Sequence, residues 1–192
     1  MAKVGLAYMV CAPIVEDLEN KTVTYNEGMV MSKAIKSDVK IDINDAKLFG
    51  DNMMIEQIKA FKGGTLSLNG DEFSNAVKAL ILGHKITSIS GPPAGEMLTA
   101  FGDDDGKFVG VGFYSDVIRG GVYKYRAVWM RKVKFGEPGD TSETKGESIN
   151  FKTPTIEGSI SRDVTGAWKN EATFDKEADA IAWLNQQAQI QG

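Results

Sequence analysis

Two strands and a tight turn are encoded in FVGVGFYSDVIRGGVYKYRAVWMRKVKF, residues 108–135. Both halves are rich in β-branched and aromatic residues, which is typical of strands. The pair Gly120-Gly121 between them can adopt the positive φ angles that a two-residue turn needs. The stretch therefore predicts antiparallel strands at 108–117 and 122–135, joined by a hairpin turn.

Further strands are expected on both sides of this hairpin, at residues 4–15, 22–25, 86–89, 150–161 and 167–174. Because proline has no N–H to donate to a neighbouring strand, Pro13 predicts that the first of these strands lies at a sheet edge. Residues 91–106 and 136–146 contain proline and glycine, and both segments are predicted to be loops.

A long projecting hairpin is predicted at about residues 38–68. Val39, Ile41 and Ile43 alternate with polar residues, which is the period of a strand. A second extended run covers residues 55–68, and residues 45–52 are expected to join the two strands.

Two helices complete the prediction. Asp71 is expected to cap the first helix, Gly83 is expected to end it in a left-handed conformation, and its apolar residues recur at helical spacing: Phe73, Ala76, Val77, Leu80 and Ile81. The second helix is expected to begin at Asp175 and to run through Gln189. The sequence thus predicts one domain, residues 1–192, that is a mainly antiparallel β-sandwich or barrel with a flanking helix and a C-terminal helix.

The composition excludes several classes of function. The formal net charge of −4 gives no general attraction to nucleic acid or to an anionic membrane. No apolar stretch approaches the ~20 residues that span a bilayer, and no secretion signal is recognised, so we expect no membrane anchor and synthesis in a cytoplasm. The single Cys11 excludes an internal disulfide and predicts a buried apolar role.

No catalytic, metal or cofactor site is expected. His84 is the only histidine, and a capping or surface role is favoured over catalysis. The run 103–105 is read as an acidic turn, since the EF-hand ligand pattern does not follow it. Gly110 and Gly112 lie in a strand with no helix behind them, which favours close packing against another backbone over a phosphate loop.

Basic and aromatic residues interleave along residues 122–135, as in a nucleic-acid stacking platform. Strand alternation places Tyr123, Tyr125, Ala127, Trp129, Val133 and Phe135 on one face, and Lys124, Arg126, Lys132 and Lys134 on the other. That sorting favours a half-buried strand. Arg131 falls on the aromatic face, and we hypothesise that a neighbouring subunit supplies its partner, so that Arg131→Glu impairs assembly more than monomer folding.

The run TKGESINFKTPTIEGSI, residues 144–160, follows the 108–135 block and resembles the signature region of siphophage major tail tube proteins. The likeness extends to residues 2–6, to Ala12-Pro13-Ile14 and to Leu82-Gly83-His84, so it spans nearly the whole chain. It implies a β-sandwich-like core with a flanking helix. It also implies hexameric rings that stack into a hollow virion tail tube, through which the phage genome leaves.

The resemblance further implies partners and surfaces. The implied partners are other copies of the chain, the tape-measure protein, the tail terminator and the distal tail proteins, with DNA passing unbound. The residues expected at self-assembly contacts are Asp45, Lys47, Phe49 and Asp51 on the hairpin, Arg131, and Glu143 and Lys145 on an arm at 136–148. Because a channel must not hold phosphate, the acidic Asp42, Asp51 and Glu56 are expected to face it.

Two alternatives remain open. The first is a related tube of a bacteriocin, secretion or injection system, which has the same ring-forming logic. The second is a monomeric β-sandwich that recognises carbohydrate or protein through Trp129, Trp168, Trp183 or the aromatic strand at 122–135.

Overall fold

A computed structural model of the chain describes residues 2–3, 5–51, 53–139 and 153–190. Its body is a ten-stranded sheet in which all paired strands run antiparallel. The main path follows the order β3-β2-β9-β10-β11-β6-β5, while β1 pairs with β9, β12 with β10 and β4 with β2. The strands of this sheet are β1 Ala2–Lys3, β2 Ala7–Asp17, β3 Thr22–Tyr25, β4 Met29–Ser32, β5 Ala34–Gly50, β6 Met53–Gly70, β9 Val109–Arg119, β10 Val122–Phe135, β11 Thr155–Ile160 and β12 Lys169–Phe174.

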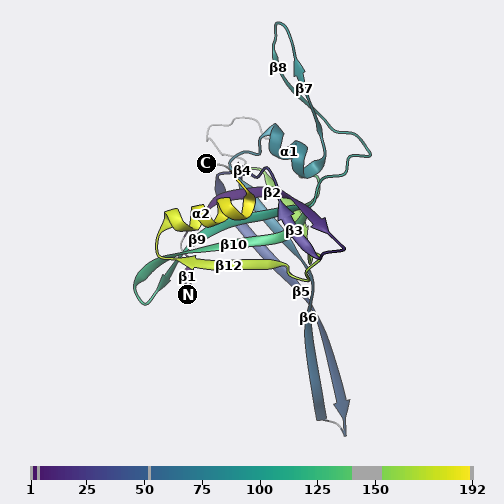
Figure 1. The fold of residues 1–192 in the computed structure, drawn as a ribbon, viewed down its shortest axis with the longest axis vertical. Helices are drawn as coiled ribbons and strands as arrows, with labels where there is room; N and C mark the ends of the chain where they lie inside the picture. Colours follow the sequence, from purple (N-terminus) through teal and green to yellow (C-terminus); the bar gives the residue numbers. More distant parts are fainter. Residues whose placement is uncertain (1, 4, 52, 140–152, 191–192) are drawn as a thin grey trace, which may run out of the picture.

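Two helices and a second small sheet complete the fold (Figure 1). Helix α1 spans Asn75–Leu82, and helix α2 spans Glu177–Ala188. Strands β7 (Lys85–Ile89) and β8 (Gly95–Thr99) pair only with each other. The mainly antiparallel β fold with a flanking helix and a C-terminal helix is therefore confirmed.

The sheet has an apolar cluster on each side. One cluster joins α1 to residues of β2, β4, β6, β9, β10 and β11, including the fully buried Leu66, Ile81 and Val109. The other cluster packs α2, through Ala180, Leu184 and Ala188, onto β2, β9 and β10. Strands β9 and β10 are covered on both sides, so they form the centre of the molecule.

The central hairpin agrees with the sequence prediction. Strands β9 and β10 are joined by Gly120 and Gly121, whose φ angles are 59° and 79°. Gly110 and Gly112 leave room for the Trp129 indole: a Cβ on Gly110 would lie 2.2 Å from Trp129 Cζ2. The expectation of packing against another backbone was wrong for both glycines, because a side chain fills that space.

The predicted sorting of β10 into two faces holds only for part of the strand. A register shift between Met130 and Val133 marks a bulge, in which β10 has one more residue than β9. Beyond the bulge, Val133 and Phe135 join Met130 in the cluster with α1, whereas Trp129 belongs to the cluster with α2. The expectation of a single aromatic face was therefore wrong, because the bulge reverses the alternation.

Strand β2 is not at an edge of the sheet, contrary to the prediction from Pro13. It pairs with β9 on one side, and with β4 and then β3 on the other. Residue pairs with β4 end at Cys11, and those with β3 begin at Ile14. Pro13 therefore lies where β2 changes partners, a position at which a missing N–H breaks no ladder.

Two other local predictions need correction. Ser74 caps α1, through a 3.3 Å hydrogen bond from the Val77 N–H to Ser74 Oγ, whereas Asp71 accepts bonds from Ser32 Oγ and Lys33 N. Gly83 ends α1 at φ 85°, as predicted. The predicted loop 91–106 contains β8, and α2 begins at Glu177 after Asp175.

Two hairpins project from opposite ends of the body along its longest axis (Figure 1). Strands β5 and β6 form one of them, and β7 and β8 form the other. β5 continues to Gly50 and Asp51 lies in the turn, so the predicted connector 45–52 is mostly strand. Among the described residues, no helix is long and apolar enough to cross a membrane.

Candidate self-assembly surfaces

The β5–β6 hairpin has a proximal half that belongs to the core and a distal half that does not. In the proximal half, Val39 pairs with the fully buried Leu66, and Ile41 packs against the α1 cluster. From Ile43 to Leu48 on β5, and from Met53 to Ala60 on β6, every residue whose burial is described is exposed. The described part of the chain supplies no second layer for the distal half.

Strand alternation assigns the distal residues to two sides. On β5, Asp45 and Lys47 lie on the same side as Ile41, while Ala46 and Leu48 lie on the opposite side. Cross-strand pairing places Ile58 beside Ala46. The apolar side of the distal half is thus the reverse of the side that faces the core in the proximal half.

We call this reversed surface the distal apolar side, defined by Ala46, Leu48 and Ile58. Leu48 is 57% exposed and Ile58 is 59% exposed. Near the turn, Met53, Met54 and Ile55 are 71%, 53% and 67% exposed. A surface of this kind on a two-stranded ribbon is typical of a site that another protein covers.

Polar side chains on the other side of the distal half bond to one another. Asp45 accepts hydrogen bonds of 2.7 and 2.8 Å from Gln57 Nε2, and Lys47 Nζ lies 3.8 Å from Asp45 Oδ2. Asp45 and Lys47, both expected at a self-assembly contact, are therefore neighbours on this side, which also carries Ile43, 56% exposed. Phe49 lies in β5 with its side chain outside the described part, and Asp51 lies in the turn.

The acidic residues expected to face a channel are divided by the same alternation. Asp42 lies on the side of Leu48, and Glu56 pairs directly with Leu48. Both carboxylates therefore border the distal apolar side, while Asp51 lies beyond it at the turn. Glu143 and Lys145 lie outside the described residues.

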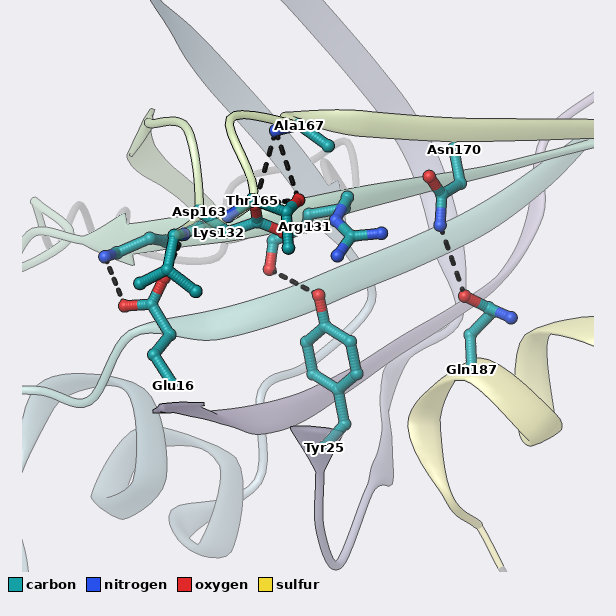
Figure 2. A network of polar contacts seen from close by, with 10 residues as sticks. Glu16, Tyr25, Arg131, Lys132, Asp163, Thr165, Ala167, Asn170 and Gln187 are labelled. Carbon is teal, nitrogen blue, oxygen red and sulfur yellow. Dashed lines mark hydrogen bonds and ion pairs between the residues drawn. The ribbon is translucent and has the colours of Figure 1, made fainter. Parts of the chain in front are cut away.

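Arg131 has its partner within its own chain (Figure 2). Its Nε donates to Asp163, which is 5% exposed and precedes β12 in a tight loop. The carboxylate of Asp163 also accepts from Thr165 N at 2.8 Å, Thr165 Oγ1 at 2.6 Å and Ala167 N at 3.2 Å. The reason for expecting a neighbouring subunit at Arg131 is therefore wrong, because an intrachain carboxylate meets the need.

This polar network fastens the loop before β12 to the sheet. The Arg131 carbonyl accepts a 2.8 Å hydrogen bond from the Tyr25 hydroxyl, and Lys132 pairs with Glu16, which also accepts from Val164 N at 2.9 Å. Burial opposes ionisation of Asp163, but hydrogen bonds from Thr165 and Arg131 outweigh it and keep the pKa of the carboxyl below its usual value. The charged residues at the β10 bulge thus have a structural role.

The basic residues of β10 are all paired with carboxylates. Lys124 pairs with Asp175, Arg126 with Glu171, Lys132 with Glu16 and Lys134 with Asp105. The Arg126 hydrogen bond is the main reason that the pKa of Glu171 falls to about 2. Trp129 is fully buried, and Tyr114 and Tyr125 pack edge to face. Tyr123 is 58% exposed, but the pairing of the cations and the packing of the other aromatic residues give a nucleic-acid stacking platform no support.

The tryptophans of the carbohydrate-binding alternative pack against the apolar clusters of the chain, Trp129 fully buried and Trp168 and Trp183 partly buried. Trp129 has no exposed surface and meets Tyr25 edge to face, with ring centroids 5.1 Å apart. Trp168 stacks on Phe61 with centroids 4.7 Å apart, and Trp183 lies beside Phe174. Their arrangement serves the core and gives the carbohydrate alternative no support.

The remaining chemically interesting residues have structural surroundings. His84 was expected to have a capping or surface role, but its side chain is only 7% exposed, so a surface position was wrong. Its Nε2 lies 3.0 Å from Glu137 Oε2. Cys11 is fully buried as predicted, and burial raises the pKa of its thiol to about 12. Within the described ranges, no group of acidic, histidine or cysteine side chains is placed to hold a metal ion.

Comparison with known proteins adds no relative: no protein-family model matches this chain, and neither does any curated protein.

Proposed function

We propose that the chain is a structural subunit of a phage tail tube. Copies assemble into hexameric rings, and the rings stack into the conduit through which the genome is delivered. The observation that carries this proposal is the distal apolar side of the β5–β6 hairpin, which no described residue of the same chain covers. The resemblance of residues 144–160 to tail tube proteins is the reason for proposing a tail tube in particular.

The size of the exposed surface supports an assembly function. Complete burial of one large aliphatic side chain stabilises a protein by about 1.5–3 kcal/mol. Six such side chains in the distal half are each more than half exposed: Ile43, Leu48, Met53, Met54, Ile55 and Ile58. Covering them would contribute about 5–11 kcal/mol per copy before the entropic cost of association. An isolated two-stranded hairpin is marginal in water, so a covering partner also accounts for the length of these strands.

The pairing of the basic residues supports a conduit that does not retain DNA. Phosphate binding needs lysine and arginine groups that release counterions. On β10 these groups are already neutralised by carboxylates of the same chain, and the whole chain carries a net charge of −4. In this proposal the protein is made in the host cytoplasm and resides in the virion tail. The tape-measure protein, tail terminator and distal tail proteins are its further partners.

Electron microscopy of the purified protein tests the proposal, together with sedimentation velocity at increasing concentration. We expect rings or tubes with an open channel. The variant Leu48→Lys should not form tubes, whereas the control Gln57→Lys should, because it places the same charge on the polar side of the same hairpin. Wild-type protein that remains a single copy at every concentration would refute the proposal.

A further inference from the structure

The β7–β8 hairpin is a second projecting surface, at the end of the molecule opposite β5–β6 (Figure 1). Its strands are connected by residues 90–94 and pair from Lys85 with Thr99 to Ile89 with Gly95. Its sequence lies partly in the segment 91–106 that was predicted to be a loop. This hairpin is a sheet separate from the ten-stranded one, and Ile89 and Met97 on one of its sides are exposed among the described residues.

The two sides of this hairpin differ. Ile86 and Leu98 form a pair and are half-buried, and Glu96 on the same side accepts a 3.0 Å hydrogen bond from Asn75 of α1. That side is turned toward the body. On the opposite side, Met97 is 47% exposed and Ile89 is 45% exposed. We call this opposite side the outer β7–β8 face.

We propose that the outer β7–β8 face receives the distal apolar side of the β5–β6 hairpin from the next copy along the tube. This inference rests on the proposed function and adds the surface on which that hairpin lands. If two distal apolar sides met each other, the contact would be self-complementary and would close as a dimer. An open stack instead needs two different surfaces on each copy.

The position of the exposed apolar residues selects the second surface. Outside the distal half of β5–β6, large exposed apolar side chains occur on β2 and at the β2–β3 turn, on β4 and the start of β5, between β8 and β9, beside the β9–β10 turn and on β7–β8. Only β7–β8 lies at the far end of the longest axis from the β5–β6 tip (Figure 1). A contact that repeats along that axis therefore joins these two hairpins.

The chemistry of the two surfaces is compatible. Both present aliphatic or thioether side chains on extended ribbons, namely Leu48 and Ile58 on one and Ile89 and Met97 on the other. Methionine adapts its shape to an opposing apolar surface. Because the Asn75 and Glu96 contact holds the inner side of β7–β8 to α1, the outer face is presented in a fixed direction.

Lysine substitutions test the pairing. Met97→Lys should reduce mean tube length by at least about tenfold, because it places a charge in an apolar contact. Val122→Lys is the matched control, since Val122 is 57% exposed beside the β9–β10 turn, away from both hairpins. Circular dichroism and thermal unfolding establish that both variants fold. Normal tubes from Met97→Lys, or an equal loss in Val122→Lys, would overturn the inference while leaving the tube proposal intact.

Mixing distinguishes a contact between two different surfaces from a self-contact. Leu48→Lys copies keep the outer β7–β8 face, and Met97→Lys copies keep the distal apolar side. Each variant alone should fail to stack. Their mixture should form one contact and then stop, giving pairs of rings or dimers by sedimentation velocity. A mixture with no new species would overturn the inference, and wild-type protein that never assembles would overturn the proposed function as well.

Cysteine cross-linking provides a direct readout that does not depend on loss of assembly. Cys11, the natural cysteine, is buried, so new exposed cysteines react selectively. Met97→Cys mixed with Ile58→Cys should give a disulfide-linked dimer under mild oxidation, at a yield several-fold above that of Val122→Cys mixed with Ile58→Cys. Equal yields would count against the inferred contact.

Discussion

Asp163→Ala is expected to destabilise the folded single copy strongly, because the Asp163 carboxylate gathers four donors in a buried place. The donors are Arg131 Nε, Thr165 N, Thr165 Oγ1 and Ala167 N, and Asp163 is only 5% exposed. Removing one member of a buried ion pair costs about 3–5 kcal/mol. For a chain of this size, that loss corresponds to a fall in melting temperature of about 6–20 °C.

Arg131→Ala should cost less, because Asp163 keeps its bonds from Thr165 and Ala167. Loss of one hydrogen bond to a charged group costs about 1.5–3 kcal/mol. The double variant should cost less than the two single changes added together, because they share one interaction. This order of effects follows from the asymmetry of the network: the carboxylate has several partners, whereas the guanidinium has one carboxylate.

Urea unfolding at a concentration where the protein is a single copy measures these costs, with tryptophan fluorescence as the signal. Arg126→Ala is the control, because its partner Glu171 has a side chain that is 34% exposed, and such pairs contribute about 0–1 kcal/mol. A larger cost for Arg131→Ala than for Asp163→Ala would refute the reasoning. So would variants that fold normally and lose only assembly, which was the hypothesis drawn from the sequence.

The remaining predictions concern acid, thiol reactivity and packing. Folding lowers the pKa values of Asp163 and Glu171. The stability that these carboxylates contribute is therefore present above their unfolded pKa values of about 4, and it is lost as the pH falls through the lower folded pKa values. Glu171→Gln should flatten the decline in urea midpoint below pH ~4.5. Cys11, with its thiol pKa raised to about 12, should react with Ellman's reagent only after denaturation, and rapid labelling of native protein would contradict its burial. Gly112→Ala should destabilise by about 1–3 kcal/mol in thermal unfolding, because its Cβ would lie 2.6 Å from Trp129 Cε3, and an unchanged melting temperature would contradict that packing.

Features with a local cause were predicted well. The β9–β10 hairpin follows from two strand-like runs around Gly120-Gly121, and the end of α1 follows from Gly83 after a helical apolar stripe. Each depends on the conformational preference of a few adjacent residues. Errors arose where the partner is distant in sequence. Asp163 is 32 residues from Arg131, and nothing near either residue indicates that they meet.

The bulge in β10 had a visible signal. Val128 and Met130 are two residues apart, as expected for one face of a strand, but the next buried apolar residue is Val133, three positions later. A strand alternates with a period of two, so a spacing of three requires either an extra residue or a change of side. Here β10 has an extra residue between Met130 and Val133, and this bulge places Val133 on the same side of the sheet as Met130, in the same cluster.

The same spacing of three occurs in β5, between Ile43 and Ala46, but the structural outcome there is the opposite. No register shift lies between Ile43 and Leu48, and the nearby extra residue belongs to β6. The apolar residues of β5 therefore change sides without correction by a bulge. Ile41 on the proximal side packs against the chain's own core, whereas no described residue of the chain covers the reversed distal side. In β5, which has no bulge, the apolar residues move from one side of the strand to the other. This change of side separates the part of the hairpin that packs against the core from the surface that we assign to assembly.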